Sequence, residues 1–292
     1  MELSLLMKLR IGAAMAVGVV LVGILAWQMA GPSEPAGSIG GDGATILILL
    51  AFVAGLGAYF VSWPYGREIG VLAVPSGLAV WAVRSGSMAA LMQLYPAVTQ
   101  RQGLLAALRW EPIFWLTVLA AGFAGVLLGQ QIRPGIKLNM TGGKPNSSSG
   151  KHLNTLIALI CSGFIAQLCI RIFAQDISMS DSRLGSVVSQ PAIGQIVFAV
   201  LVSFGLSAFL VKEFLNVGYI WPTIAAAFVT AFAASIYIRQ MQYVVQSWPA
   251  AFFSNAVVSI LPVQMVAFGA LGSIAGYWMA VRYSYWRKHE QK

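Results

Sequence analysis

Apolar residues occur in long runs, separated by short connections rich in polar residues, glycine and proline. Each run holds about 20 predominantly apolar residues, the length an α-helix needs to cross a bilayer. The runs lack the two-residue alternation of membrane barrels, and a backbone in lipid must satisfy its own hydrogen bonds. The pattern therefore predicts an all-α integral membrane protein with about eight transmembrane helices. We expect them at 11–30, 44–63, 66–84, 112–131, 153–174, 193–212, 217–238 and 256–281.

The composition supports a lipid environment. Apolar types make up 58% of the 292 residues and charged types only 9%, whereas soluble domains carry about 25% charged residues. A chain with so little charge cannot cover its own surface in water. The first apolar run follows Lys8 and Arg10 as a signal peptide would, but it is longer than a usual signal core and no small-x-small cleavage site follows it. We therefore predict that it is retained as the first span.

The chain contains a repeated stretch. The heptapeptide GLGAYFV at 55–61 returns as GLSAFLV at 205–211, with four letters identical and Phe209 in place of Tyr59. Further matches keep the same order, with Pro75 opposite Pro222, Pro112 opposite Pro262 and Gly122 opposite Gly272. The alternative explanation is that membrane helices of similar length resemble one another by composition.

We interpret the series as a duplication. Residues 1–138 and 151–292 are predicted to be two copies of a four-helix membrane unit, joined by a flexible cytoplasmic linker at 139–150. Because four is an even number, each copy enters and leaves on the same side of the membrane. The copies are therefore expected to be parallel repeats, related by an axis along the membrane normal.

The charge distribution predicts the orientation. Of the 18 Lys and Arg residues, 12 fall in the inner segments and 6 in the outer ones if the amino terminus is inside. Both termini are thus expected in the cytoplasm of a multi-pass protein of the cell inner membrane, with the anionic inner leaflet as its lipid partner. The net charge of +9 forms no basic stripe interleaved with aromatic residues, so a nucleic-acid partner is not expected.

The sequence offers no catalytic constellation. His152 and His289 lie outside the predicted helices, and no helix carries two carboxylates at its centre. Cys161 and Cys169 share one apolar run without histidine or carboxylate neighbours, which argues against a disulfide framework or a metal site. We therefore expect no enzymatic activity, no cofactor such as haem and no metal.

A basic–acidic doublet recurs at the inner hairpins of the two copies. Arg67-Glu68 follows the second predicted helix, and Lys212-Glu213 ends the sixth. One interpretation is an interfacial cap with topogenic charge, since a carboxylate such as Glu68 complements a helix amino terminus. The other is an inner gate or a docking point for a partner.

Two further pairs are candidates. Arg84 and Arg239 end the third and seventh predicted helices, where they would reach lipid headgroups or bind an anion. Gln167 and Gln264 are the best candidates to line a solute path, because polar uncharged groups inside the spans are few. Helix–helix hydrogen bonding explains them equally well.

The function predicted from these features is a permease-like carrier for a small solute, with its path between the two repeats. The alternative is a haem-free membrane anchor or quinone-facing subunit, or an assembly factor, of a larger membrane complex with partner membrane or cytosolic subunits. The scarcity of charge inside the spans argues against proton coupling.

Overall fold

The computed structural model describes residues 5–31, 41–135 and 148–290. Within these residues, eight helical stretches are long and apolar enough to cross a membrane, which confirms the prediction of about eight long apolar helices. Their bounds are Leu5–Ala30, Gly41–Val61, Gly66–Arg84, Val98–Ile132, His152–Phe173, Ile193–Leu215, Ile220–Val245 and Pro262–Arg287. Most of the linker predicted at 139–150 lies outside the described residues.

The chain divides into two compact units. Unit 1 comprises Met1–Ser85 and Phe114–Asn139, and unit 2 comprises Gly86–Ile113 and Met140–Lys292. Segment Gly86–Ile113 belongs to the first half of the sequence, but its contacts group it with the second unit. The repeat boundaries inferred from the sequence stay a prediction.

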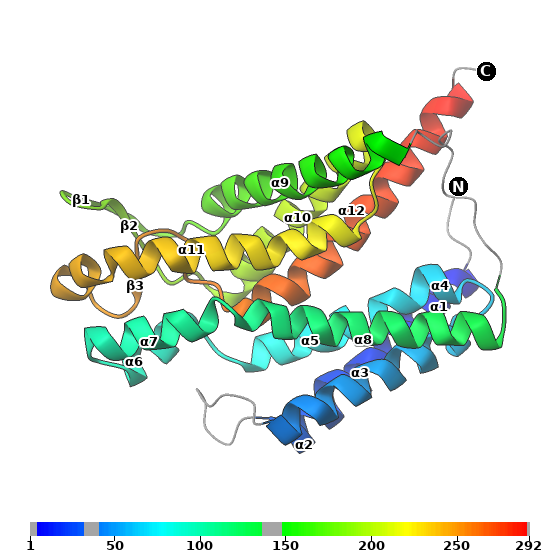
Figure 1. Ribbon diagram of the computed structural model, residues 1–292, viewed down its shortest axis with the longest axis horizontal. Coiled ribbons are helices and arrows are strands. Elements are labelled where there is room, and N and C mark those ends of the chain that lie inside the picture. The colour runs from blue at the N-terminus through cyan, green and yellow to red at the C-terminus, as the bar shows by residue number, and fades with distance from the viewer. Residues whose placement is uncertain (1–4, 32–40, 136–147, 291–292) are drawn as a thin grey trace. The chain divides into compact units, whose positions relative to one another are not determined.

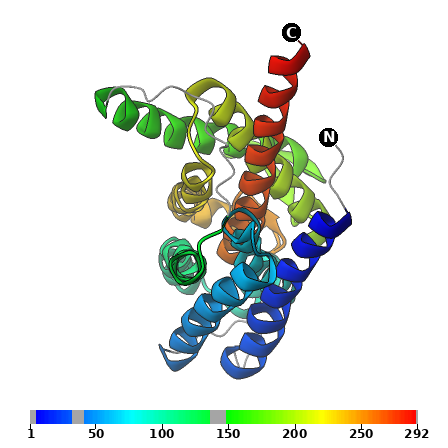
Figure 2. The same ribbon diagram turned by 90° about the vertical axis from the view of Figure 1, so that its right-hand side faces the viewer.

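Unit 1 is a helical bundle. Its elements are α1 (Leu5–Gly18), the π-helical turn η1 (Val19–Leu25), α2 (Ala26–Ala30), α3 (Gly41–Val61), α4 (Gly66–Ile69), the 3₁₀ turn η2 (Gly70–Leu72), α5 (Ala73–Arg84) and most of α8 (Glu111–Ile132). Helices α1 and α3 lie side by side, and α5 packs on α1 and η1 (Figure 1; Figure 2). Pro75 lacks a backbone N–H and cannot bond to the preceding turn, which accounts for the 3₁₀ geometry there.

A close crossing of α3 and α8 holds unit 1 together. A side chain at Gly55 would overlap the backbone of Gly122, and one at Gly125 would overlap the backbone of Phe52. Only glycine lets two helix backbones approach this closely. The crossing brings the apolar faces of both helices into contact, with Ala51 and Val126 buried.

Unit 2 contains a second bundle. Its elements are α6 (Met88–Leu94), α7 (Val98–Leu108), α9 (Ser148–Phe173), β1 (Ser178–Asp181), β2 (Gly185–Ser189), α10 (Ile193–Leu215), α11 (Ile220–Ser247), β3 (Phe252–Phe253) and α12 (Pro262–Glu290). Helix α10 packs along α9 and α12, and α11 packs on α9, α12 and α7 (Figure 1). Asn216 ends α10 with a left-handed φ of 52°, a conformation that asparagine tolerates better than most residues.

The α10–α12 crossing is as close as the one in unit 1. A side chain at Gly276 would overlap the backbone of Gly205, and one at Gly272 would overlap the carbonyl oxygen of Leu201. Phe204 and Ile274 are fully buried beside this crossing.

A small antiparallel sheet lies beside the carboxyl-terminal end of α11 (Figure 1). Its strand order is β1-β2-β3, with Val188 opposite Ser178 on one side and opposite Phe253 on the other. The sequence analysis predicts no strand here, because the segments are too short to show a clear alternation.

Several predicted boundaries differ from the structure. The first helix begins at Leu5 rather than at residue 11. Helix α11 continues to Ser247 rather than ending at residue 238, so Arg239 lies within this helix and not at its end. The region 85–111, expected as a connection, contains helices α6 and α7. The last predicted helix begins at Pro262 rather than at residue 256, and residues 254–261 form consecutive turns. Proline favours the first turn of a helix, where its missing N–H costs nothing.

Candidate functional site

The second predicted doublet is held by contacts within unit 2. The Lys212 ammonium donates a hydrogen bond to Asn216 Oδ1 at 2.5 Å and lies 5.2 Å from the centre of the Tyr277 ring. The Glu213 carboxylate accepts a hydrogen bond from Ser284 Oγ and pairs with Arg287, both at 2.9 Å. These contacts fasten the end of α10 to α12.

The first doublet, in α4, is arranged differently. Arg67 is exposed, whereas Glu68 is half-buried and its Oε2 has no hydrogen-bond partner among the described residues. Glu68 lies in the first turn of a helix, whereas Glu213 lies in the last turn of one. The two carboxylates therefore have different surroundings, and a shared gating or docking role for the doublets stays a prediction.

Cations in both units lie over aromatic rings, as expected at a membrane interface. In unit 1 the guanidinium of Arg133 lies 3.9 Å from the Trp63 ring centre, and in unit 2 that of Arg282 lies 4.9 Å from Trp286. Arg84 is exposed, donates to the Gly23 carbonyl oxygen at 3.3 Å and lies 5.8 Å from the Trp27 ring. This geometry suits the predicted contact with headgroups.

Arg239, the proposed counterpart of Arg84, is exposed on α11. The two arginines belong to different units, so their joint binding of an anion stays a prediction.

Gln264, one of the two predicted path-lining glutamines, is fully buried, and both the nitrogen and the oxygen of its side-chain amide make hydrogen bonds. Its Nε2 donates to the Gly86 carbonyl oxygen at 3.0 Å, and its Oε1 accepts from the Leu261 N–H at 3.1 Å. Gln264 thereby fastens the first turn of α12 to the chain just before α6. Gln167 is half-buried on α9. Their role in a solute path stays a prediction.

The turns at 254–261 form a buried, non-helical segment. The side-chain oxygen of Asn255 accepts from the N–H groups of Val257 and Val258 at 3.0 and 3.3 Å, an arrangement that asparagine commonly makes in turns. The Gln190 amide donates to the Ser259 carbonyl oxygen at 3.1 Å. Side chains thus satisfy backbone groups that a helix would otherwise satisfy.

The same glutamine connects this segment to α6. Gln190 Oε1 accepts from the Ala89 N–H at 3.0 Å. Together with Gln264, it ties the α6–α7 region to the segment that precedes α12.

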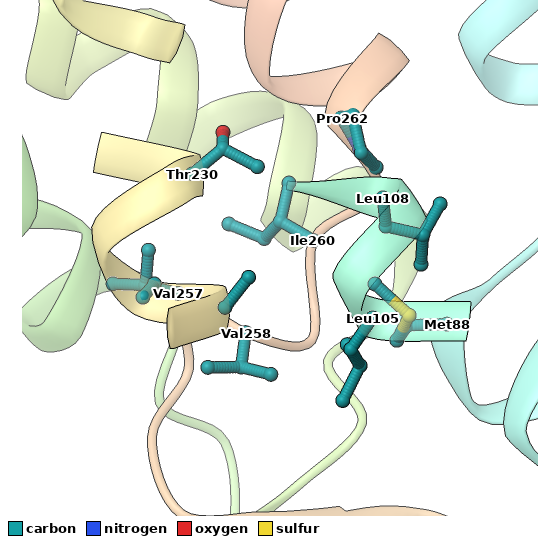
Figure 3. A pocket seen from close by; sticks show the side chains of 10 residues that line it. Met88, Leu105, Leu108, Thr230, Val257, Val258, Ile260 and Pro262 are labelled. Carbon is teal, nitrogen blue, oxygen red and sulfur yellow. The ribbon is translucent and has the colours of Figure 1, made fainter. Parts of the chain in front are cut away.

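A small pocket lies where α6, α7, α11 and the buried turns meet (Figure 3). It has room for about one water molecule. Its walls are apolar apart from Thr230, whose hydroxyl donates to the Ala226 carbonyl oxygen at 2.9 Å. The lining residues are Met88, Leu105, Leu108, Thr230, Ala233, Ala234, Val257, Val258, Ile260 and Pro262.

The structure adds one residue that the sequence analysis counted only as an outer positive charge. Arg101, on α7, is 8% exposed, and its Nε donates to the Tyr95 carbonyl oxygen at 2.7 Å. It precedes the pocket residues Leu105 and Leu108 by four and seven positions, so all three lie on one face of α7. That spacing is the feature of the sequence that would have revealed the buried position.

Buried hydroxyl groups form a second polar feature of unit 2. Ser162, Ser203 and Ser273 are fully buried, and their Oγ atoms have no hydrogen-bond partner among the described residues. Ser207, also buried, donates to the Ser162 carbonyl oxygen at 3.5 Å. These serines place uncharged polar groups on the facing helices α9, α10 and α12.

The described residues contain no group of three His, Cys, Asp or Glu side chains placed to hold a metal ion. The absence of a metal, a cofactor and enzymatic activity remains an expectation from the sequence.

Asp181 binds the β1–β2 hairpin to the end of α11. Its carboxylate accepts from Trp248 Nε1 at 2.9 Å and from the N–H groups of Arg183 and Leu184 at 2.8 Å. These bonds, that of Trp248 first, lower the pKa of the Asp181 carboxyl below its usual value.

We expect acid to release the hairpin from Trp248. A carboxyl whose pKa is lowered in the folded state contributes stability above its unfolded pKa of about 3.9, and this stability is lost as the pH falls through the folded value. The nitrogen-15 signal of the Trp248 indole, assigned with the variant Trp248→Phe, should stay constant down to about pH 4 and shift as the pH falls further. A signal that shifts fully above about pH 4, or that stays constant down to about pH 1, would contradict the prediction.

Comparison with models of protein families, with curated proteins and with solved structures finds no match to this chain. The class is therefore defined by the structure: a helical protein with eight described helices long and apolar enough to cross a membrane.

Proposed function

We propose that this chain is a permease-like membrane carrier for a small solute, and that the pocket between α7 and α11 belongs to its path. The observation that carries the proposal is the buried non-helical segment 254–261, which forms one wall of the pocket. In membrane proteins, non-helical backbone at membrane depth is tolerated where protein buries it or where it lines a cavity. Carriers commonly bind solutes at such interrupted helices.

The origin of the lining residues supports the same function. Leu105 and Leu108 come from the first predicted repeat, and Val258 and Thr230 come from the second. A pocket with walls from both repeats is what a path between two repeats requires. All of these residues lie in unit 2.

We also infer that the two halves arose by duplication, because equivalent positions make equivalent contacts. Gly55 meets Gly122 in unit 1, and Gly205 meets Gly272 in unit 2, an offset of 150 for both partners. The same offset relates the hydrogen bond from Tyr59 to the Arg133 carbonyl oxygen and the ring contact of Phe209 with Tyr283. Similar composition alone does not reproduce matched pairs of contacts.

The test is solute permeability of vesicles that contain the purified protein. Swelling under gradients of glycerol, urea, short amides and short carboxylates would be followed by light scattering, with protein-free vesicles as reference. We expect at least one solute to enter faster with the protein present, and Leu105→Trp to abolish the increase by filling the pocket. Leu156→Trp is the matched control, because Leu156 is 55% exposed on α9.

A second variant keeps the test informative if Leu105→Trp fails to fold. Val258→Ala removes two methyl groups from the pocket wall and is expected to raise the permeability. Permeability equal to that of protein-free vesicles for the whole panel would contradict the carrier. Recovery in a fixed ratio with other membrane subunits would then favour the role of a membrane anchor or assembly factor.

A further inference from the structure

Arg101 is a buried cation without an acidic partner. It is 8% exposed, and no acidic side chain among the described residues forms an ion pair with it. Burial of a charge is costly unless an opposite charge or several hydrogen bonds compensate for it. The bond from Nε to the Tyr95 carbonyl oxygen satisfies one of the five guanidinium donors.

The walls around Arg101 contain no acid in their sequence. No Asp or Glu occurs in helices α6, α7 and α11 or in residues 251–261. Arginines elsewhere in this part of the unit lie over aromatic rings, such as Arg109 over Trp110 and Arg183 over Tyr243. None of the cation–π contacts of the described residues involves Arg101.

Arg101 lies beside the pocket. Leu105, one helical turn from Arg101 on α7, and Ala233, one turn from Tyr237 on α11, both line the pocket. Tyr237 is 2% exposed on α11, the helix that packs on α7. The next turn of the same α11 face carries Gln240, whose buried Oε1 has no hydrogen-bond partner among the described residues.

We propose that Arg101 and Tyr237 form a binding site for a small carboxylate whose short apolar tail enters the pocket. With Nε bonded to Tyr95, the two terminal nitrogens of Arg101 present parallel donors that match the two oxygens of a carboxylate. The Tyr237 hydroxyl adds a neutral donor. Leu105, Leu108 and Val258 then surround the tail, and the pocket, which has room for about one water molecule, limits the tail to about one methyl group.

The proposal rests on the carrier function and names its substrate class. It is tested by binding rather than by transport, so that either idea can fail alone. Purified protein in detergent would be titrated calorimetrically with formate, acetate and propionate, and with the neutral analogues formamide, acetamide and propionamide. We expect the carboxylates to bind and the amides to bind at least about tenfold more weakly, since the amides lack the charge.

Variants assign the binding to the site. Arg101→Gln is expected to abolish carboxylate binding, and Arg101→Lys to weaken it about tenfold, because lysine keeps the charge but loses the paired donors. Tyr237→Phe should weaken it by a smaller factor. Arg183→Gln is the matched control, since it removes an exposed arginine of the same unit, and it should leave binding unchanged.

Three results would overturn the proposal. They are equal binding of carboxylates and amides, no binding of either by the folded wild-type protein, and unchanged binding by Arg101→Gln. If Arg101→Gln does not fold, unchanged carboxylate binding by both Arg101→Lys and Tyr237→Phe would overturn the proposal. If the protein binds carboxylates but does not make vesicles permeable to any solute, the binding site is supported and the carrier function is contradicted.

Discussion

Replacement of Gly276 by alanine is expected to destabilise the protein strongly, because a β-carbon at this position would overlap the backbone of Gly205 on the facing helix. The obstacle is backbone rather than a flexible side chain, so α10 and α12 would have to move apart along their whole contact. Overpacking of this kind costs about 1–3 kcal/mol and sometimes more. Gly55→Ala, which would overlap Gly122 in unit 1, should behave alike. Thermal unfolding of the purified protein in detergent measures both effects.

The matched controls carry the same substitution where space allows it. A β-carbon at Gly163 on α9 would lie 3.8 Å from Val229 Cγ2, and one at Gly57 on α3 would lie 3.6 Å from Val17 Cγ1. Alanine favours a helix over glycine by about 1 kcal/mol, so these two variants should melt at or above the temperature of the wild type. If Gly276→Ala also melts at or above the wild-type temperature, the close crossing of α10 and α12 is wrong.

The long helices could be predicted because each one corresponds to a continuous run of apolar residues in the sequence. An apolar run of about 20 residues has few folded alternatives in lipid, and the ends at Pro64 and Asn216 involve residues that commonly terminate helices. The start of α12 at Pro262 was not predicted, because the apolar run continues through Val257 and Ile260 without any change in hydropathy.

The candidate site was harder to predict because its residues owe their burial to distant contacts. The segment 88–108 contains a proline, several polar residues and one charged residue among its apolar ones, so its sequence fits an exposed connection as well as a pair of packed helices. Arg101 is buried on α7, a helix that packs on the distant helix α11. Gln264 was recognised as a polar residue inside a span, but its partner Gly86 lies 178 positions away, beyond the reach of any local pattern.

The irregular segment before α12 links the fold to the candidate function, because it forms one wall of the pocket. Its backbone departs from helical geometry, and amide side chains from three parts of the sequence, Gln190, Asn255 and Gln264, bind the freed groups. A polar network of this kind fixes one arrangement when every member is satisfied. It therefore holds the walls of the pocket in place.

Replacement of Gln264 by leucine is expected to lower the stability of the protein by roughly 1–3 kcal/mol. Leucine is similar in size, but it leaves the Gly86 carbonyl and the buried Leu261 N–H without the side-chain bonds they have now, and an unpaired buried N–H carries a desolvation cost. The melting temperature in detergent should fall. Hydrogen exchange in the α6–α7 region should also become faster, because the bond to Gly86 fastens that region to α12.

Gln167→Leu is the matched control for this substitution. Gln167 is half-buried on α9, and it makes no side-chain hydrogen bond with another described residue. The same change should therefore leave the free energy of unfolding within about 0.5 kcal/mol of the wild-type value. The pair of variants separates two roles for Gln264. A loss of stability with faster exchange at residues 88–108 identifies a positioning residue of the buried segment. Unchanged stability combined with altered solute permeability would instead make Gln264 a path-lining residue and would contradict the expected result.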